Sequence, residues 1–80
     1  MTIKILTFGI MRDIAGAERL EMELPNGANV AELEAALALQ FPSIRRLGAL
    51  FIAVNAEYAN PDTVLSEQDE VALIPPVSGG

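Results

Sequence analysis

The stretch "DEVALIPPVSGG", residues Asp69–Gly80, decides which fold the chain is expected to adopt. Its apolar part, Val71–Ile74, has no polar face, which is typical of a strand covered on both sides at the centre of a sheet. Pro75 and Pro76 end this strand because proline has no N–H group to donate to a neighbouring strand. The other strongly apolar strand with alternating β-branched residues is predicted over Thr2–Phe8. We expect these first and last strands to pair at the centre of the sheet, and that pairing would be parallel.

The segments between these two strands supply the remaining elements. Apolar and charged residues alternate cleanly over Arg19–Leu24, which predicts a strand with one buried face. Asn29 and Glu32 have the spacing of a capping box, and they begin a helix predicted over residues 30–40. Pro42 ends that helix because the residue before a proline leaves the α region. We also expect a short helical turn, an apolar strand, and a short strand with a turn after it, at residues 10–16, 49–55 and 56–65.

This order of strands around one helix predicts an α+β fold of the β-grasp (ubiquitin-like) type. A mixed sheet of four to five strands would carry the helix across one of its faces. The 80 residues suffice for one domain with a small core. We therefore expect a β-grasp domain over residues 1–74 and an extended C-terminal tail over residues 75–80.

The composition excludes several classes of function. The chain has no cysteine and no histidine, so it lacks the commonest metal ligands and the commonest general base, and we expect no metal site and no bound cofactor. Its net charge of −6 opposes binding to nucleic acids or to an anionic membrane and favours a basic protein partner. No stretch approaches the roughly 18 uninterrupted apolar residues of a membrane span. The absence of cysteine suits a cytoplasmic protein.

The closing pair Gly79-Gly80 has two interpretations. Such a pair ends about 0.5% of chains by chance, if glycine occupies about 7% of positions, and it would then be a plain flexible end. In favour of a function, the two prolines stiffen the tail in an extended form that reaches on the order of 18 Å from the sheet. Glycine also passes through a narrow channel because it lacks a Cβ atom. We favour a working carboxylate at Gly80, which an ATP-using partner adenylates and a sulfur or nitrogen nucleophile then attacks.

Four segments, "GIMRDIAG", "NVAELEAAL", "FIAVNAEY" and "DEVALIPPVSGG", together resemble the small, sulfur-carrier subunits of molybdopterin synthase. The resemblance covers essentially the whole chain, and the closing segment is its most specific part. It implies the β-grasp fold and a thiocarboxylate at Gly80, formed with an E1-like adenylyltransferase, ATP and a sulfur donor protein. The chain would not be a catalyst alone, because the large subunit transfers the sulfur to precursor Z (cyclic pyranopterin monophosphate) to make molybdopterin. The tail residues inside the large subunit's channel would be Pro75, Pro76, Val77, Ser78 and Gly79.

A face for partner docking is expected beside the tail. The helix can cover only one face of the sheet, yet the strand at residues 49–55 and the last strand are apolar on both faces. We therefore expect an exposed apolar patch that includes Phe8, Phe51 and Ile74, and such patches mark protein interfaces. The alternative is that some of these side chains fill a core beneath a loop at residues 43–48.

The charged residues are mostly interpreted as solvated. Glu21 and Glu23 are expected on a solvated strand face, and Arg45 and Arg46 in a solvent-facing loop. Two acidic residues before the last strand are candidates to pair with basic residues of a partner, namely Asp69 and Glu70. The roles of Arg12 and Asp13, which match the family segment, stay open.

Two turns depart from the family's usual pattern. Gln68 stands where glycine is common, and a left-handed conformation there would cost glutamine roughly 1 kcal/mol. Ala56 stands where Asn-Gly would give a tight type I′ hairpin. Both departures put the local turn geometry in doubt and leave the tail untouched.

Three rival functions remain open from the sequence. The first is a sulfur carrier for thiamine or cysteine biosynthesis, in which the chemistry at Gly80 would be the same, although the ending "PPVSGG" favours molybdopterin synthesis. A ubiquitin-like modifier that is joined to lysines is a second rival, and an interaction module with an inert tail is a third. The sequence does not decide the sulfur acceptor, the stoichiometry of the complex, or the choice between molybdenum and tungsten.

Overall fold

The computed structural model describes residues 1–47 and 50–75. They form five strands, two α-helices and one 3-10 helix, which is called η1. In chain order the elements are β1 (Thr2–Thr7), α1 (Ile10–Ala15), β2 (Arg19–Glu23), α2 (Val30–Gln40), η1 (Pro42–Leu47), β3 (Phe51–Val54), β4 (Glu57–Tyr58) and β5 (Val71–Ile74).

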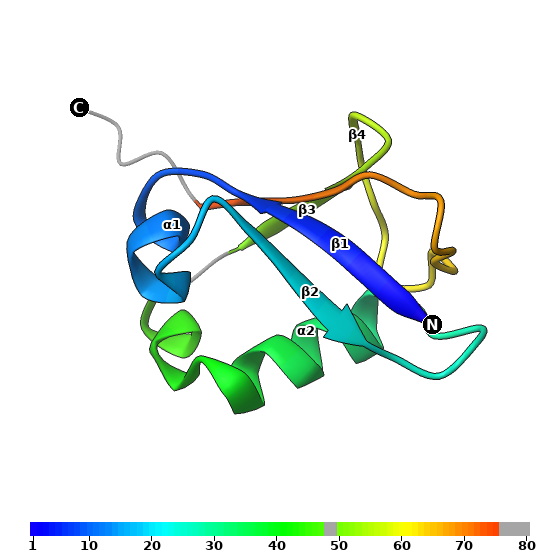
Figure 1. Ribbon diagram of the computed structural model, residues 1–80, viewed down its shortest axis with the longest axis horizontal. Coiled ribbons are helices and arrows are strands. Elements are labelled where there is room, and N and C mark those ends of the chain that lie inside the picture. The colour runs from blue at the N-terminus through cyan, green and yellow to red at the C-terminus, as the bar shows by residue number, and fades with distance from the viewer. Residues whose placement is uncertain (48–49, 76–80) are drawn as a thin grey trace.

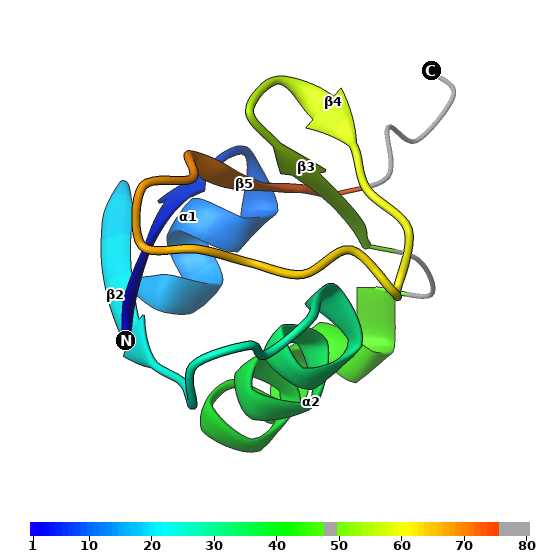
Figure 2. The ribbon, with the colours of Figure 1, turned by 90° about the vertical axis from the view of Figure 1, so that its right-hand side faces the viewer.

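The sheet is mixed and has the order β2-β1-β5-β3-β4 (Figure 1). The first and last strands, β1 and β5, are neighbours and run parallel, whereas every other pair is antiparallel. Figure 2 shows the sheet curved around the two helices, with α1 and α2 on the same side. The predicted β-grasp architecture and the central parallel pair are confirmed.

The core lies between the inner face of the sheet, which is the face turned toward α2, and the helices. Alternation along the strands sends every second side chain inward, and most of these side chains are almost completely buried. Helix α2 contributes three buried side chains at helical spacing. The buried side chains of these elements are Ile3, Ile5, Met22, Ile52, Val71 and Leu73 from the strands and Val30, Leu33 and Leu37 from α2.

Helix α2 begins and ends where the sequence predicts. The Glu32 amide donates to Asn29 Oδ1 at 2.9 Å, and the Asn29 amide donates to Glu32 Oε1 at 3.4 Å, which completes the capping box. The helix ends at Gln40, before Phe41 and Pro42. The expected loop after it is wrong in part, because residues 42–47 continue as the 3-10 helix η1, with Arg45 and Arg46 exposed as predicted.

Helix α1 confirms the helical turn predicted at residues 10–16. Met11 is completely buried, whereas Ile10 is about half exposed, at 49%. The helix begins at Gly9, whose φ is 56° and ψ −133°, and ends at Gly16 in the left-handed region.

The two turns in doubt have opposite outcomes. Asn55 and Ala56 both have positive φ, 53° and 69°, and Val54 pairs with Glu57, so the hairpin adopts the two-residue type I′ geometry without glycine. At Gln68 the chain avoids the left-handed conformation that would be costly for glutamine, so this turn differs from one that requires glycine. Among the described residues, Asn55 and Ala56 are the non-glycine residues with positive φ.

Candidate functional site

The predicted site residues divide into two groups. Phe8, Phe51, Ile74 and Pro75 belong to the described part of the chain. The other tail residues predicted to work in a partner's channel lie outside the described residues, namely Pro76, Val77, Ser78, Gly79 and Gly80. The described part of the candidate site therefore consists of the sheet face that carries the predicted patch and the root of the tail.

The register of the sheet brings the three predicted patch residues together. Phe51 is the direct cross-strand partner of Ile74. Thr7, the last residue of β1, pairs with Leu73, so Phe8, which follows β1, lies beside Ile74. All three belong to the outer face of the sheet, which is the face turned away from α2. Phe8 is 45% exposed and Phe51 is 48% exposed, so the alternative, a core beneath a loop at residues 43–48, is wrong for these two side chains.

Two residues of the patch, Phe8 and Ile74, line a shallow depression of about 440 Å³, here called the apolar hollow. Its floor is low because two alanines, Ala53 and Ala72, face each other across β3 and β5. Larger side chains stand around them. The hollow is lined by Leu6, Phe8, Ala53, Ala56, Tyr58, Glu70, Ala72 and Ile74. Small residues ringed by large ones give a concave surface that can accept an apolar side chain of a partner.

Sequence reasoning missed Tyr58 as a member of this surface. It is 73% exposed, and its ring centroid lies 5.6 Å from that of Phe51. Strand β4 contains only two residues, too few for alternation to show which side chain faces outward. The signal that could have found Tyr58 is the type I′ hairpin, which places Tyr58 opposite Ala53.

The root of the tail is held against the start of α1. A Cβ atom built on Gly9 would lie 3.3 Å from Cγ of Pro75, so only glycine allows this approach without a shift. The φ of 56° at Gly9 also disfavours a side chain there. Pro75 follows directly on Ile74 of the patch. The chain therefore leaves the sheet at the edge of the apolar hollow.

Asp69, a candidate for partner contacts, and Arg12, whose role the sequence left open, both have internal partners. The carboxylate of Asp69 accepts hydrogen bonds from Asn55 Nδ2 at 3.0 Å and from the Ser66 amide at 2.8 Å. It therefore ties the 54–57 hairpin to the turn before β5, at the end of β5 remote from Pro75. Arg12 forms an exposed ion pair with Glu18, at 3.6 Å. A pair of this kind contributes little stability. Glu21, Glu23 and Asp13 are exposed.

The described residues offer a binding surface and no catalytic constellation. No group of three metal-ligating side chains occurs among them, and no helix there is long and apolar enough to cross a bilayer. What the described part of the chain supplies is an exposed apolar face next to the root of the tail.

Comparison with known proteins gives one family. The model described as the ThiS family matches residues 5–80. A protein from Chlamydomonas reinhardtii named molybdopterin synthase sulfur carrier subunit is 37% identical to this chain over 83 residues, with 100% of both chains covered.

Two solved structures are similar in fold and sequence. In a complex of subunits 1 and 2 of the molybdopterin-converting factor from Helicobacter pylori 26695, the similar chain is 28% identical, with 100% of both chains covered and a TM-score of 0.70. SAMP1 from Haloferax volcanii is 26% identical, with 100% of both chains covered and a TM-score of 0.83.

Proposed function

Because this chain belongs to the ThiS family and is similar over its whole length to molybdopterin synthase sulfur carrier subunits, we propose that it is the sulfur-carrying small subunit of molybdopterin synthase. The observation that carries the proposal is the extent of the similarity, which includes the Gly-Gly end as well as the domain. The docking face and the anchored tail root are what such a carrier needs.

The chemistry proposed for the tail is a cycle at one carbon atom. The Gly80 carboxylate attacks the α-phosphorus of ATP on an E1-like adenylyltransferase, and pyrophosphate leaves. Hydrosulfide released by a donor protein then attacks the acyl carbon, AMP leaves, and loss of the proton gives a thiocarboxylate at Gly80. On the large subunit the sulfur passes to precursor Z, and water supplies the oxygen that restores the carboxylate. A terminal glycine suits each attack because no side chain crowds its carbonyl carbon.

The rest of the chain positions that carbon. The apolar hollow with Phe8, Phe51 and Ile74 gives the large subunit a surface to bury beside the point where the tail begins. The contact between Gly9 and Pro75 fixes that point relative to the sheet. A fixed root reduces the conformational entropy that the tail loses on entering a partner's channel. We propose that Pro76, Val77, Ser78 and Gly79 lie inside this channel, one after another along its length.

Deletion of Gly80 is the direct test of the proposal. We expect the shortened chain to have the urea midpoint of the wild type, since residue 80 follows the described domain, and to give no molybdopterin with the large subunit and precursor Z. Intact-protein mass spectrometry after incubation with the adenylyltransferase, ATP and a sulfide source should show one oxygen replaced by sulfur in the wild type only. Sulfur transfer by the shortened chain would end the proposal.

A second candidate function rests on the similarity to SAMP1. Related modifier proteins with this fold are represented among the solved structures, and SAMP1 itself is 26% identical to this chain. A modifier would appear in branched conjugates on lysine side chains, with the loss of one water molecule for each bond formed. A carrier would appear as the free chain with a terminal thiocarboxylate, so the same mass measurement on cell extracts separates the two.

A further inference from the structure

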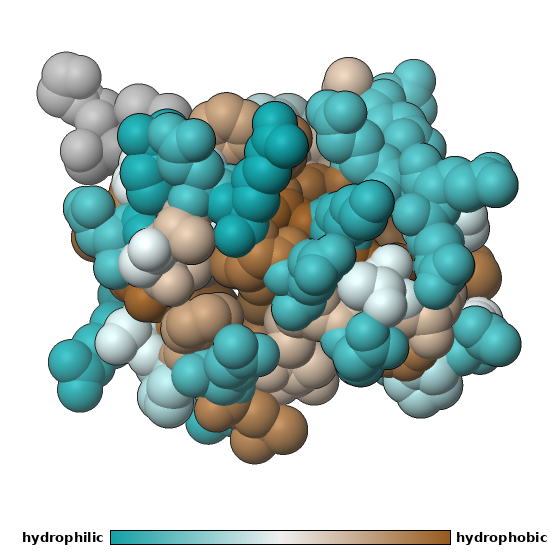
Figure 3. Space-filling model, viewed as in Figure 1, coloured by the Kyte–Doolittle hydropathy of each residue, from teal (hydrophilic) through white to brown (hydrophobic). Residues whose placement is uncertain are grey.

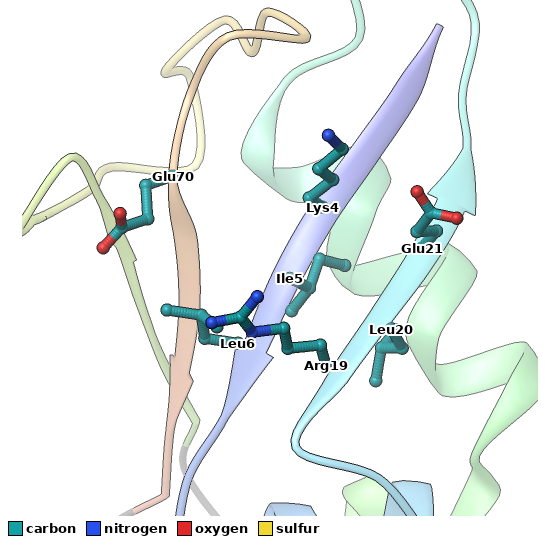
Figure 4. A pocket seen from close by; sticks show the side chains of 7 residues that line it. All are labelled: Lys4, Ile5, Leu6, Arg19, Leu20, Glu21 and Glu70. Carbon is teal, nitrogen blue, oxygen red and sulfur yellow. The ribbon is translucent and has the colours of Figure 1, made fainter.

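A second depression lies beside the apolar hollow on the outer face of the sheet. It has a volume of about 550 Å³, and two residues, Leu6 and Glu70, belong to both depressions. The others that line it are Lys4, Ile5, Arg19, Leu20 and Glu21 (Figure 4). In the space-filling view of Figure 3, hydrophobic surface shows between hydrophilic side chains over this part of the sheet. We call this depression the charged hollow, and it continues the apolar hollow toward β2.

Arg19 stands at the boundary between the two hollows. It pairs with Leu6 in the β1–β2 register. Figure 4 shows its side chain extending from β2 across β1, with the guanidinium group beside Leu6. Its hydrocarbon stem therefore covers apolar surface while its charged end faces the region that a docked partner would cover.

Arg19 has no carboxylate partner among residues 1–47 and 50–75, although the chain has eleven acidic and five basic residues. The nearest carboxylate by register, that of Glu21, is opposite Lys4 and forms no ion pair within 4.0 Å. By contrast, Arg12 does pair, with Glu18. In the described part of this acid-rich chain, the guanidinium at the edge of the apolar face has no carboxylate partner.

An interface that covers this guanidinium has to supply a negative charge. Burying an unpaired charge is costly, whereas a hydrogen-bonded carboxylate offsets that cost. Arginine is well suited to this because its planar fork binds both oxygens of a carboxylate and its stem packs on apolar surface. Arginine is also enriched among the residues that dominate binding at protein interfaces.

We infer that Arg19 is the charged anchor of the docking face and binds a carboxylate of the synthase large subunit, with Lys4 beside it on the rim. This inference rests on the proposed function for the identity of the partner. A second copy of this chain is disfavoured as the occupant because two molecules with a net charge of −6 repel each other. The bound complex of subunits 1 and 2 in the similar Helicobacter structure supports the large subunit as the occupant.

The test is the dissociation constant for the large subunit, measured by titration calorimetry at low and high salt. Arg19→Glu should weaken binding by at least about 30-fold, and Arg19→Gln by less, because truncation of a buried charge pair has effects of this order. The matched control is Arg45→Glu, which makes the same change of charge on η1, an element that packs against α1 and α2. It should change the dissociation constant by less than about threefold, as expected for a rim or distant charge. Circular dichroism and urea unfolding verify that each variant is folded.

Each result of this test is decisive. If Arg19→Glu and Arg19→Gln bind as tightly as Arg45→Glu, the inference is overturned while the proposed function stands. If the wild-type chain does not bind the large subunit at all, both fail. If Arg19→Glu weakens only binding to the adenylyltransferase, or only dissociates a dimer seen by sedimentation, the assigned occupant is wrong. Since the carboxylate form of the chain is used, the result does not depend on the sulfur chemistry at Gly80.

Discussion

The inner and outer faces of the sheet are formed by the same strands, but the reason why their side chains are apolar differs between the two faces. On the inner face, the neighbours Val71 and Leu73 of β5 are completely buried against α2. On the outer face, Ala72 and Ile74 of the same strand are only partly buried, and Phe51 beside them is 48% exposed. Both sets are apolar. The inner set is explained by folding, whereas nothing in the described part of the molecule covers the outer set.

This difference shows why hydrophobicity alone does not identify a core. An apolar side chain that stays exposed contributes little to the free energy of folding, so its retention at several adjacent positions points to binding. The outer face also combines small and large side chains into a concave surface and ends at the root of the tail. Changes on the inner face should therefore alter stability, and changes on the outer face should alter affinity.

The largest expected effect tests the inner face. Leu73→Ala removes a side chain that is 0% exposed, and we expect it to lower the free energy of unfolding by about 2–5 kcal/mol. Its neighbour on the outer face is the matched control, and Ile74→Ala should cost less, about 1–2 kcal/mol, since that side chain is only partly buried. Urea unfolding followed by circular dichroism measures both. Equal losses for the two variants would show that the faces do not differ in the way described.

The sequence predicted the inner face better than the outer one for a physical reason. The alternation over Thr2–Phe8 and the helical spacing over residues 30–40 arise because these side chains pack in the core of this chain. The strand and the helix that they predict are both confirmed. The parallel β1–β5 pair followed from the apolar character of its two strands. The patch of Phe8, Phe51 and Ile74 could be predicted only as a surplus of apolar residues that one helix cannot cover.

What the sequence did not predict depends on contacts between distant segments. Tyr58 joins the outer face only because the hairpin folds β4 back onto β3. Met11 is buried instead of Ile10 because Gly9 turns the chain at the start of α1, and that turn has no periodic signal. The approach of Pro75 to Gly9 and the position of Arg19 above Leu6 likewise require the assembled sheet.

The next effect concerns binding by the outer face. Phe51→Ala removes one ring of the aromatic pair with Tyr58 and one wall beside the apolar hollow. We expect binding to the large subunit to weaken by at least about 30-fold, as for an interface hot spot. The free energy of unfolding should fall by only about 1 kcal/mol, which is the scale of a cross-strand pair. Titration calorimetry and urea unfolding on the same samples measure the two quantities, and a large loss of stability with unchanged affinity would reverse the assignment of this residue.

A smaller effect is expected at the junction between the two faces. Gly9→Ala introduces a side chain at a φ of 56° and crowds Pro75, so we expect the free energy of unfolding to fall by about 1–3 kcal/mol. The control is Gly27→Ala, which also has a positive φ but has no atom within 4 Å of the added Cβ. Both variants should lose stability, but only Gly9→Ala should also slow sulfur transfer to precursor Z, because it displaces the tail root. If the two variants transfer sulfur at the same rate, the contact with Pro75 has no part in presenting the tail.

The smallest effect tests whether stability can be raised without changing either face. Ala56 has a φ of 69° in the type I′ hairpin, a conformation that costs an alanine about 1–2 kcal/mol and costs glycine almost nothing. The greater freedom of glycine in the unfolded chain opposes folding by about 0.4–1 kcal/mol and offsets part of this relief. Ala56→Gly should therefore stabilise the protein by roughly 0.5 kcal/mol. The same chemical change at Ala35→Gly, on the exposed side of α2, should destabilise it by about 1 kcal/mol because glycine is a poor helix former. Urea unfolding distinguishes opposite signs of this size. A loss of stability at both positions would mean that Ala56 is not strained, and that the hairpin carrying Tyr58 onto the outer face does not have the type I′ geometry.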